Sequence, residues 1–345
     1  MDVSTGVSRG VSKDAPLLEV SGLSVEFDVR GRSVRAVNGL SYTLEEGETL
    51  AILGESGSGK SVAAQAVLGI LDSPPARVTG GSVRLRGEEL LGLPEHRRRA
   101  YRGDRISMIF QDALSALNPV LTVGDQLAEM FRAHRGMRRR EARDRAAELM
   151  ERVRIPSARQ RLGEHPHRFS GGMRQRVMIA MALALEPDVL IADEPTTALD
   201  VTVQAQIMRL LADLQDELRM GLVLITHDLG VVAGIADRIV VMYAGAVAEQ
   251  APAADLYARP AHPYTAGLLA SVPRVDRGGG AVSPIRGAPP DPAAPPPGCP
   301  FHPRCPRAER VCGIEVPPLV EVAPGHAAAC HFAEEVHRGG RPLAR

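Results

Sequence analysis

The sequence predicts an α/β fold in which a mainly parallel sheet carries a phosphate-binding loop, and three observations support this prediction. The strand-like run Glu48–Leu53 leads into a glycine-rich turn and then into a helix-like run, Ser61–Leu71. The short apolar runs Val189–Ala192 and Leu222–Thr226 are typical of central parallel strands. A tail rich in proline and cysteine predicts a small irregular lobe at the carboxyl end.

The remaining elements place the domain boundaries. Leu17–Val29 and Arg35–Leu44 alternate apolar and polar residues, as half-buried strands do. Helix-like and strand-like runs alternate from Val177 to Glu249, as in a sheet covered by helices. We therefore expect a flexible leader at 1–16, an α/β domain at 17–259 with a helical subdomain inserted at about 113–168, and a cysteine-bearing C-terminal region at 260–345.

The overall composition argues against a nucleic-acid-binding protein. Lys and Arg together number 41, as do Asp and Glu, so the formal net charge is +0 and there is no broad basic field. Aromatic residues make up 3% of the chain and tryptophan is absent, which disfavours stacking platforms for single strands. The basic runs Arg97–Arg99 and Arg138–Arg140 lie near acidic residues and are typical of solvated helix faces.

No segment of the sequence has the length and apolarity of a membrane span. Met1–Pro16 lacks the apolar core of a secretory signal, and no apolar run elsewhere reaches transmembrane length. We therefore expect a cytosolic protein. If it serves a membrane process, another subunit has to supply the path through the membrane.

One run fits the phosphate-binding pattern G-x-x-x-x-G-K-S/T. It consists of Gly54, Glu55, Ser56, Gly57, Ser58, Gly59, Lys60 and Ser61. The glycines allow backbone N–H groups to turn toward phosphate oxygens, and the following helix directs its positive end at them. Lys60 is expected to reach the β- and γ-phosphates, and Ser61 to bind Mg²⁺. The chain has only two lysines, Lys13 and Lys60, which indicates that position 60 requires an ammonium group.

A second acidic motif complements this loop. The apolar run Val189–Ala192 ends in Asp193 and Glu194. Asp193 is expected to hold Mg²⁺ through its water shell, and Glu194 to polarise a water for attack on the γ-phosphate. An acidic strand end alone would be an ordinary surface feature, but with the phosphate loop it indicates nucleotide hydrolysis.

The segment Ser170-Gly171-Gly172 lies between these two motifs and is followed by polar residues. In this position it resembles the signature sequence of the ABC ATPase family. That resemblance implies that Ser170, Gly171 and Gly172 bind the γ-phosphate of an ATP held by the phosphate loop of another subunit. The physical basis is a helix N-terminus that faces an anion. One subunit alone would therefore be unable to complete a site.

Further residues match the landmarks of this family in order. Gln111 resembles the glutamine that senses Mg²⁺ and the attacking water. Asp200, after Ala198 and Leu199, resembles the loop that crosses the dimer interface. His227 resembles the switch histidine that contacts the γ-phosphate, and Phe27 is the candidate for stacking on adenine, although Phe27 could equally be a core residue.

Within this family the chain resembles the ATPases of oligopeptide and dipeptide importers. The matching runs are Phe110–Asp112, Leu117–Pro119, Asp193–Gln204 and His262–Thr265. This resemblance implies a role at the cytoplasmic face of the membrane, with a related ATPase subunit, two permease subunits and, indirectly, a substrate-binding protein as partners. Nickel chelates or another small solute are the alternative cargo.

A soluble ABC ATPase without a transport role is the main alternative function. Family members that act on DNA place long coiled coils between the phosphate loop and the signature. In this chain only about 110 residues separate Lys60 from Ser170. Members that act on ribosomes usually carry two cassettes in one chain, and this chain has one.

All four cysteines lie in the tail, namely Cys299, Cys305, Cys312 and Cys330. Disulfides are improbable in a cytosolic protein. Four thiolates in a proline-rich lobe with little core suggest a bound metal that stabilises the lobe. Zinc and an iron–sulfur cluster are the generic choices, and no C-x2-C spacing supports the usual zinc ribbon. The resemblance to peptide importers implies a 4Fe–4S cluster, with zinc or free thiols as alternatives.

Overall fold

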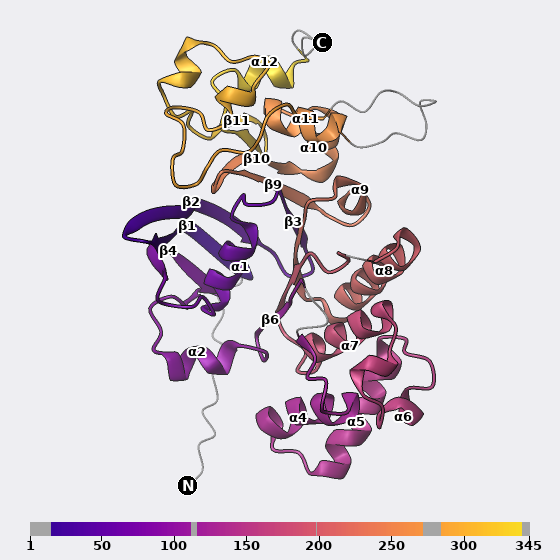
Figure 1. The fold of residues 1–345 in the computed structure, drawn as a ribbon. Coiled ribbons are helices and arrows are strands. Elements are labelled where there is room, and N and C mark those ends of the chain that lie inside the picture. Colours follow the sequence, from indigo (N-terminus) through magenta and orange to yellow (C-terminus); the bar gives the residue numbers. More distant parts are fainter. Residues whose placement is uncertain (1–14, 112–115, 198, 272–283, 340–345) are drawn as a thin grey trace.

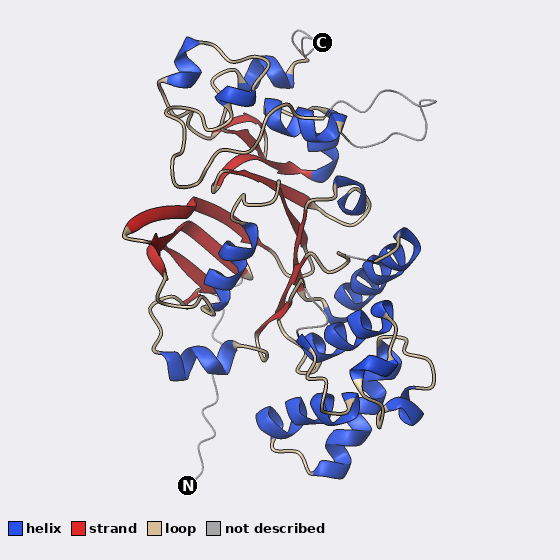
Figure 2. Cartoon of the chain, in the orientation of Figure 1, coloured by secondary structure: helices blue, strands red, loops and turns tan. Residues whose placement is uncertain are grey.

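The computed structural model describes residues 15–111, 116–197, 199–271 and 284–339 (Figure 1). Residues 1–14 of the expected leader, residues 112–115 at the start of the expected helical subdomain, and Ala198 lie outside the described residues. Two sheets and the helices around them form the fold, which confirms the predicted α/β class (Figure 2).

The smaller sheet is antiparallel and has the strand order β2-β1-β4-β5. Its strands are β1 (Leu18–Val29), β2 (Arg32–Leu44), β4 (Ala76–Leu85) and β5 (Glu88–Glu89). The alternation seen in the sequence at Leu17–Val29 correctly predicted β1, because one face of this strand packs on the core while the other faces solvent.

The larger sheet has eight strands in the order β11-β12-β10-β9-β3-β8-β7-β6. Its parallel part runs from β9 to β6, and β10, β12 and β11 continue it in antiparallel fashion. The parallel strands are β3 (Thr49–Leu53), β6 (Ile106–Ile109), β7 (Val189–Asp193), β8 (Gly221–Thr226) and β9 (Arg238–Tyr243). The others are β10 (Ala246–Pro252), β11 (Val320–Ala323) and β12 (His326–Ala328).

The central strands are buried on both faces, and alternate side chains enter different cores. Leu50 and Ile52 of β3 join the core shared with α1 (Lys60–Leu68) and the smaller sheet. Ala51 and Leu53 point the other way, into the core shared with α7 (Gly171–Leu183) and α8 (Val201–Leu218). The period of two along a strand therefore places α1 and α7 on opposite faces of the sheet (Figure 1).

A group of short helices forms the lower part of the molecule in Figure 1. It contains α4 (Val123–Arg135), α5 (Arg139–Arg152), α6 (Ala158–Arg161) and the 3-10 turn η1 (Pro166–Arg168). Thr122 caps α4 by accepting a hydrogen bond from the N–H of Asp125 at 3.1 Å. The basic run Arg97–Arg99 lies on another short helix, α2 (Glu95–Tyr101), where Arg98 and Arg99 pair with Glu95.

The C-terminal region builds on the antiparallel edge of the larger sheet. It contributes β11, β12 and several short helices, which are α11 (Pro263–Ala270), η3 (His302–Arg304), η4 (Arg310–Gly313) and α12 (Ala333–His337). Two further short helices, α9 (Leu229–Val232) and α10 (Ala253–Ala258), precede this region in the chain. Two of its strands, β11 and β12, extend the main sheet. Within the described ranges, no helix has the length and apolarity needed to cross a membrane.

Candidate nucleotide-binding and hydrolysis site

The phosphate loop connects the end of β3 to the start of α1. Gly59 caps α1 in a left-handed conformation, with φ at 97°, and a Cβ there would collide with the carbonyl oxygen of Ala36. The buried Lys60 folds back over the loop, where its Nζ donates to the carbonyl oxygens of Gly54 at 2.7 Å and Glu55 at 3.0 Å. The carbonyl oxygens of the loop therefore hold the ammonium group of Lys60 in place.

Two of the predicted Mg²⁺ ligands are already in contact. The hydroxyl of Ser61 donates to Oδ1 of Asp193 at 3.0 Å, although 132 residues separate them in sequence. Burial raises the pKa of Asp193, as does the nearby charge of Glu194, while the hydrogen bond from Ser61 and the charge of Lys60 oppose this effect. Burial also lowers the pKa of Lys60, and the neighbouring carboxylates offset part of that change. A hydroxyl beside a buried carboxylate fits the oxygen ligands that Mg²⁺ prefers.

Glu194 is the centre of a hydrogen-bonded group at the end of β7. Its backbone is left-handed, with φ at 46°, which is rare for a residue with a side chain and is typical of functional sites. Gln111 Nε2 donates to Oε2 of Glu194 at 2.9 Å, and the Thr197 hydroxyl donates to the same oxygen at 2.8 Å. His227 Nδ1 lies 3.0 Å from Oε1. Two predicted site residues, Gln111 and His227, thus contact the carboxylate of a third, Glu194.

These contacts decide the charge state of Glu194. Burial tends to raise its pKa, but the hydrogen bonds from His227 and Thr197 and the charge of Lys60 outweigh burial and lower it. Glu194 is therefore ionised at neutral pH, the state that a general base requires.

Phe27 lies on β1 at the edge of the core and also lines a cavity of about 960 Å³. The phosphate-loop residues Glu55 to Gly59 line the same cavity, as does the proline-rich segment from Pro289 to Pro297. The position of Phe27 is thus compatible with both predicted roles, that of a core residue and that of a side chain that stacks on adenine.

The signature residues lie at the start of α7. Ser170 caps α7 by accepting a hydrogen bond from the N–H of Met173 at 3.4 Å, and Asp200 caps α8 by accepting from Val203 at 2.9 Å. Gly172 faces Val203, where a Cβ would meet its methyl group, so this glycine allows α7 and α8 to pack closely. The helix α7 and the helix α1, which follows the phosphate loop, cover opposite faces of the sheet (Figure 1).

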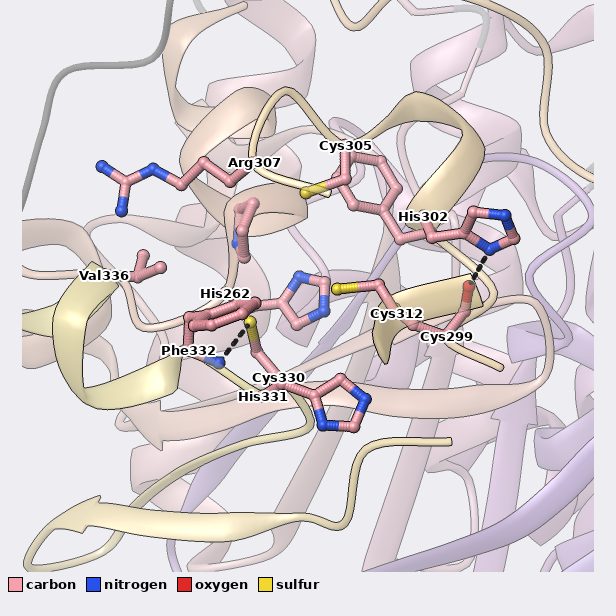
Figure 3. Close-up of a pocket in the computed structure, with 12 residues that line it drawn as sticks. His262, Cys299, His302, Cys305, Arg307, Cys312, Cys330, His331, Phe332 and Val336 are labelled. Atoms are coloured by element: carbon pink, nitrogen blue, oxygen red, sulfur yellow. Dashed lines mark hydrogen bonds between the residues drawn. The ribbon is translucent and has the colours of Figure 1, made fainter. Parts of the chain in front are cut away.

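All four cysteines line one small apolar cavity of about 20 Å³ in the C-terminal lobe (Figure 3). Burial raises the pKa of Cys299, of Cys305 to about 11 and of Cys330 to about 12. The N–H of Phe332 donates to the sulfur of Cys330 at 3.4 Å. The donor type fits thiolate ligation of iron or zinc. However, the described residues contain no group of three or more His, Cys, Asp or Glu arranged to hold a metal ion, so the predicted iron–sulfur centre is not preformed in this structure.

Sequence reasoning missed two residues that contact the site. Thr197 lies three residues after Glu194 in the turn that follows β7, so this spacing was available as a sequence pattern. Arg304 pairs with Glu55 of the phosphate loop from 249 residues away, and no local pattern in the sequence could have indicated that contact.

The helix after the phosphate loop lies on one face of the sheet and the signature helix lies on the other. Solved ATP-binding cassettes share this fold. Family models agree, since residues 37–197 match the family "ABC transporter" and residues 248–312 match "Oligopeptide/dipeptide transporter, C-terminal region". A dimeric ATP-binding cassette solved in a post-hydrolysis state with ADP and Pi has a TM-score of 0.61 at 28% identity, and the match covers 68% of this chain and 98% of that chain.

Curated relatives match almost the full length. The oligopeptide transport ATP-binding protein OppD of Salmonella typhimurium is 52% identical over 96% of this chain and 98% of its own length. The dipeptide transport ATP-binding protein DppD of Bacillus subtilis is 50% identical over 92% of this chain and 95% of its own. The chain therefore belongs to the ABC transporter ATPases, among the ATP-binding subunits of the oligopeptide and dipeptide importer family, as the sequence predicted.

The contacts of Glu194 yield a prediction about pH. Thr197→Val removes a donor that lowers the pKa of Glu194, so that pKa rises and more of the carboxyl group is protonated at a given acidic pH. We expect the acidic limb of the kcat/KM profile for ATP hydrolysis to move to higher pH, measured by phosphate release. Thr197→Ser keeps the hydroxyl and serves as the control. An unchanged acidic limb in Thr197→Val would contradict this role of Thr197.

Proposed function

We propose that this chain powers the import of di- or oligopeptides by hydrolysing ATP as half of a nucleotide-sandwich dimer. The observation that supports this proposal most strongly is that Gln111 and His227 both contact the carboxylate of Glu194, beside the phosphate loop. The signature helix on the opposite face of the sheet supports a site completed by a second ATPase subunit, either a related chain or a copy of this one. The similar solved cassette is itself a dimer with ADP and Pi.

In the proposed mechanism, backbone N–H groups of the phosphate loop other than those of Glu55 and Ser58, which have partners within the chain, surround the phosphates. Lys60 neutralises the charge of the β- and γ-phosphates. Ser61 and Asp193 would hold Mg²⁺, with Gln111 nearby, and the bound cation would offset charge on the phosphate oxygens. Ionised Glu194 orients and polarises the attacking water, and His227 contacts the γ-phosphate from the end of β8.

The partner subunit contributes its signature to this site in trans. Ser170, Gly171 and Gly172 of one chain would offer the start of α7 to the γ-phosphate held by the other, and Asp200 would lie at the contact between the chains. ATP binding then closes the dimer, and hydrolysis reopens it. The helices between about 113 and 168 would pass this movement to two permease subunits, which places the chain at the cytoplasmic face of the membrane.

We predict that Glu194→Gln keeps ATP binding but loses at least about a hundredfold in turnover, because the water loses its general base. The variant should accumulate as an ATP-bound dimer, visible as a change in molar mass by size-exclusion chromatography with light scattering. Lys60→Ala should abolish turnover as well. Glu335→Gln, which alters an exposed carboxylate on α12, is the control. Normal phosphate release by Glu194→Gln would contradict the assignment.

Peptide is the cargo favoured by the relatives, because their names state oligopeptide and dipeptide transport. We predict that di- and oligopeptides raise ATP hydrolysis severalfold when the chain is reconstituted in vesicles with its permeases and a peptide-loaded binding protein. Stimulation by a nickel chelate and not by peptides would replace peptide with the alternative cargo. Hydrolysis that no solute alters would argue for an ATPase outside transport.

For the C-terminal lobe we propose a 4Fe–4S cluster held by Cys299, Cys305, Cys312 and Cys330, with a structural or regulatory role. The four thiols around one apolar cavity support it. Zn²⁺ in the same site, or four free thiols, are the alternatives.

We predict that the chain purified without oxygen contains iron and acid-labile sulfide in equal amounts, and that Cys312→Ser loses both. Elemental analysis and the visible absorption spectrum measure this independently of ATPase activity. Exposed Ser157→Ala leaves all thiols in place and is the control. Zinc without sulfide, or no metal at all, would rule out the cluster.

A further inference from the structure

The first variable residue of the phosphate loop, Glu55, is held by the C-terminal lobe. Arg304 pairs with its carboxylate through two hydrogen bonds, from Nη1 to Oε2 at 2.6 Å and from Nη2 to Oε1 at 2.9 Å. The Arg304 side chain is only 6% exposed, and that of Glu55 is 27% exposed. A two-pronged, shielded arginine–carboxylate pair fixes orientation as well as charge, unlike a solvated surface pair.

The backbone of Glu55 is held from the same side. Its N–H donates to the hydroxyl of Tyr264 at 2.9 Å, and its carbonyl oxygen accepts from Lys60 at 3.0 Å. The N–H, the carbonyl and the side chain of Glu55 thus each have a partner. Two of those three partners, Tyr264 and Arg304, belong to the C-terminal region.

An aromatic cluster makes this support rigid. The rings of Tyr243, Tyr264 and Phe301 are mutually packed, with centroids 4.6 to 5.3 Å apart. The Tyr264 and Phe301 side chains are almost completely buried, and Arg304 also donates to the hydroxyl of Tyr243 at 3.3 Å. Because aromatic rings in this packing have few alternative rotamers, the hydroxyl of Tyr264 and the guanidinium of Arg304 are fixed relative to the loop.

The position of Glu55 makes this support relevant to nucleotide binding. A Glu55 carboxylate without Arg304 would repel the β- and γ-phosphates. Without the hydrogen bonds to its N–H and carbonyl groups, the backbone at Glu55 would be free to change the shape of the loop. The cavity that the phosphate loop lines is also lined by Pro289 to Pro297 and by Phe301. The C-terminal region therefore touches the same space that the loop surrounds.

We infer that Arg304 and Tyr264 are positioning residues for ATP, which clamp Glu55 so that the phosphate loop has its binding shape and Glu55 does not repel the phosphates. This inference rests on the proposed nucleotide site. It gives the C-terminal region a part in nucleotide affinity that acts through Glu55.

The test compares steady-state ATP hydrolysis and equilibrium binding of a fluorescent ATP analogue in the full chain. Arg304→Gln should raise KM and Kd about tenfold and change kcat less than threefold, because the clamp orders the loop before the nucleotide binds. Arg304→Lys, with a single ammonium instead of a fork, should recover only part of the affinity. Arg310→Gln, an exposed arginine of the same lobe, is the matched control and should leave both constants unchanged.

A double-mutant cycle separates clamping from general support of the fold. If Arg304 acts through Glu55, then Arg304→Gln in a Glu55→Gln background should raise Kd much less than in the wild-type chain. Tyr264→Phe removes one oxygen and keeps the packed ring, so it should raise KM by about threefold to fivefold even if Arg304→Gln fails to fold.

The outcomes distinguish this inference from the proposed function. A wild-type chain that binds no ATP would reject the nucleotide site itself. ATP binding that is normal in wild type and unchanged in both Arg304→Gln and Tyr264→Phe would overturn only the clamp. An Arg304→Gln effect of the same size with and without the Glu55 carboxylate would also overturn it.

Discussion

The carboxyl edge of the parallel sheet is the constraint on which the site depends. The strands β3, β8, β7 and β6 are neighbours and run in the same direction, so the residues that follow them emerge at one edge. The phosphate loop follows β3, His227 follows β8, Glu194 follows β7 and Gln111 follows β6. Ser61 and Asp193, which are 132 positions apart in the sequence, are thereby brought within hydrogen-bond distance, and Gln111 and His227 share Glu194 as a partner. Ligand sites in open α/β sheets lie at this edge for the same reason.

The sequence was most informative where a function requires a fixed local pattern. The glycines, Lys60 and Ser61 have to occupy consecutive places in one loop, so their spacing alone predicted the loop and the helix after it. The apolar runs before Asp193 and His227 predicted β7 and β8, because parallel strands buried on both faces lack alternation.

The sequence was least informative for contacts between distant segments. Nothing near Arg304 indicates Glu55 as its partner, and the proline-rich surroundings of β11 and β12 gave no indication that these strands extend the main sheet. Such pairings depend on how the chain folds back, and the local residue pattern does not encode them. The cysteines illustrate the same limit, since their spacing indicated a shared site but not the distances between their sulfur atoms.

A buried carboxylate on β10 ties the C-terminal lobe to the main sheet, so the lobe is an integral part of the cassette. The carboxylate of Glu249 on β10 is fully buried and accepts hydrogen bonds from the N–H groups of Ala261 at 2.6 Å and His262 at 2.9 Å, with His326 Nε2 on β12 at 2.7 Å. A buried carboxylate is tolerated only when such partners are present, and removal of one partner typically costs about 3–5 kcal/mol. Because all these partners lie beyond β10, the C-terminal region supplies the hydrogen bonds that this buried carboxylate requires. The same region also holds Glu55 through Arg304, so the stability of the sheet edge and the shape of the phosphate loop depend on one packed unit.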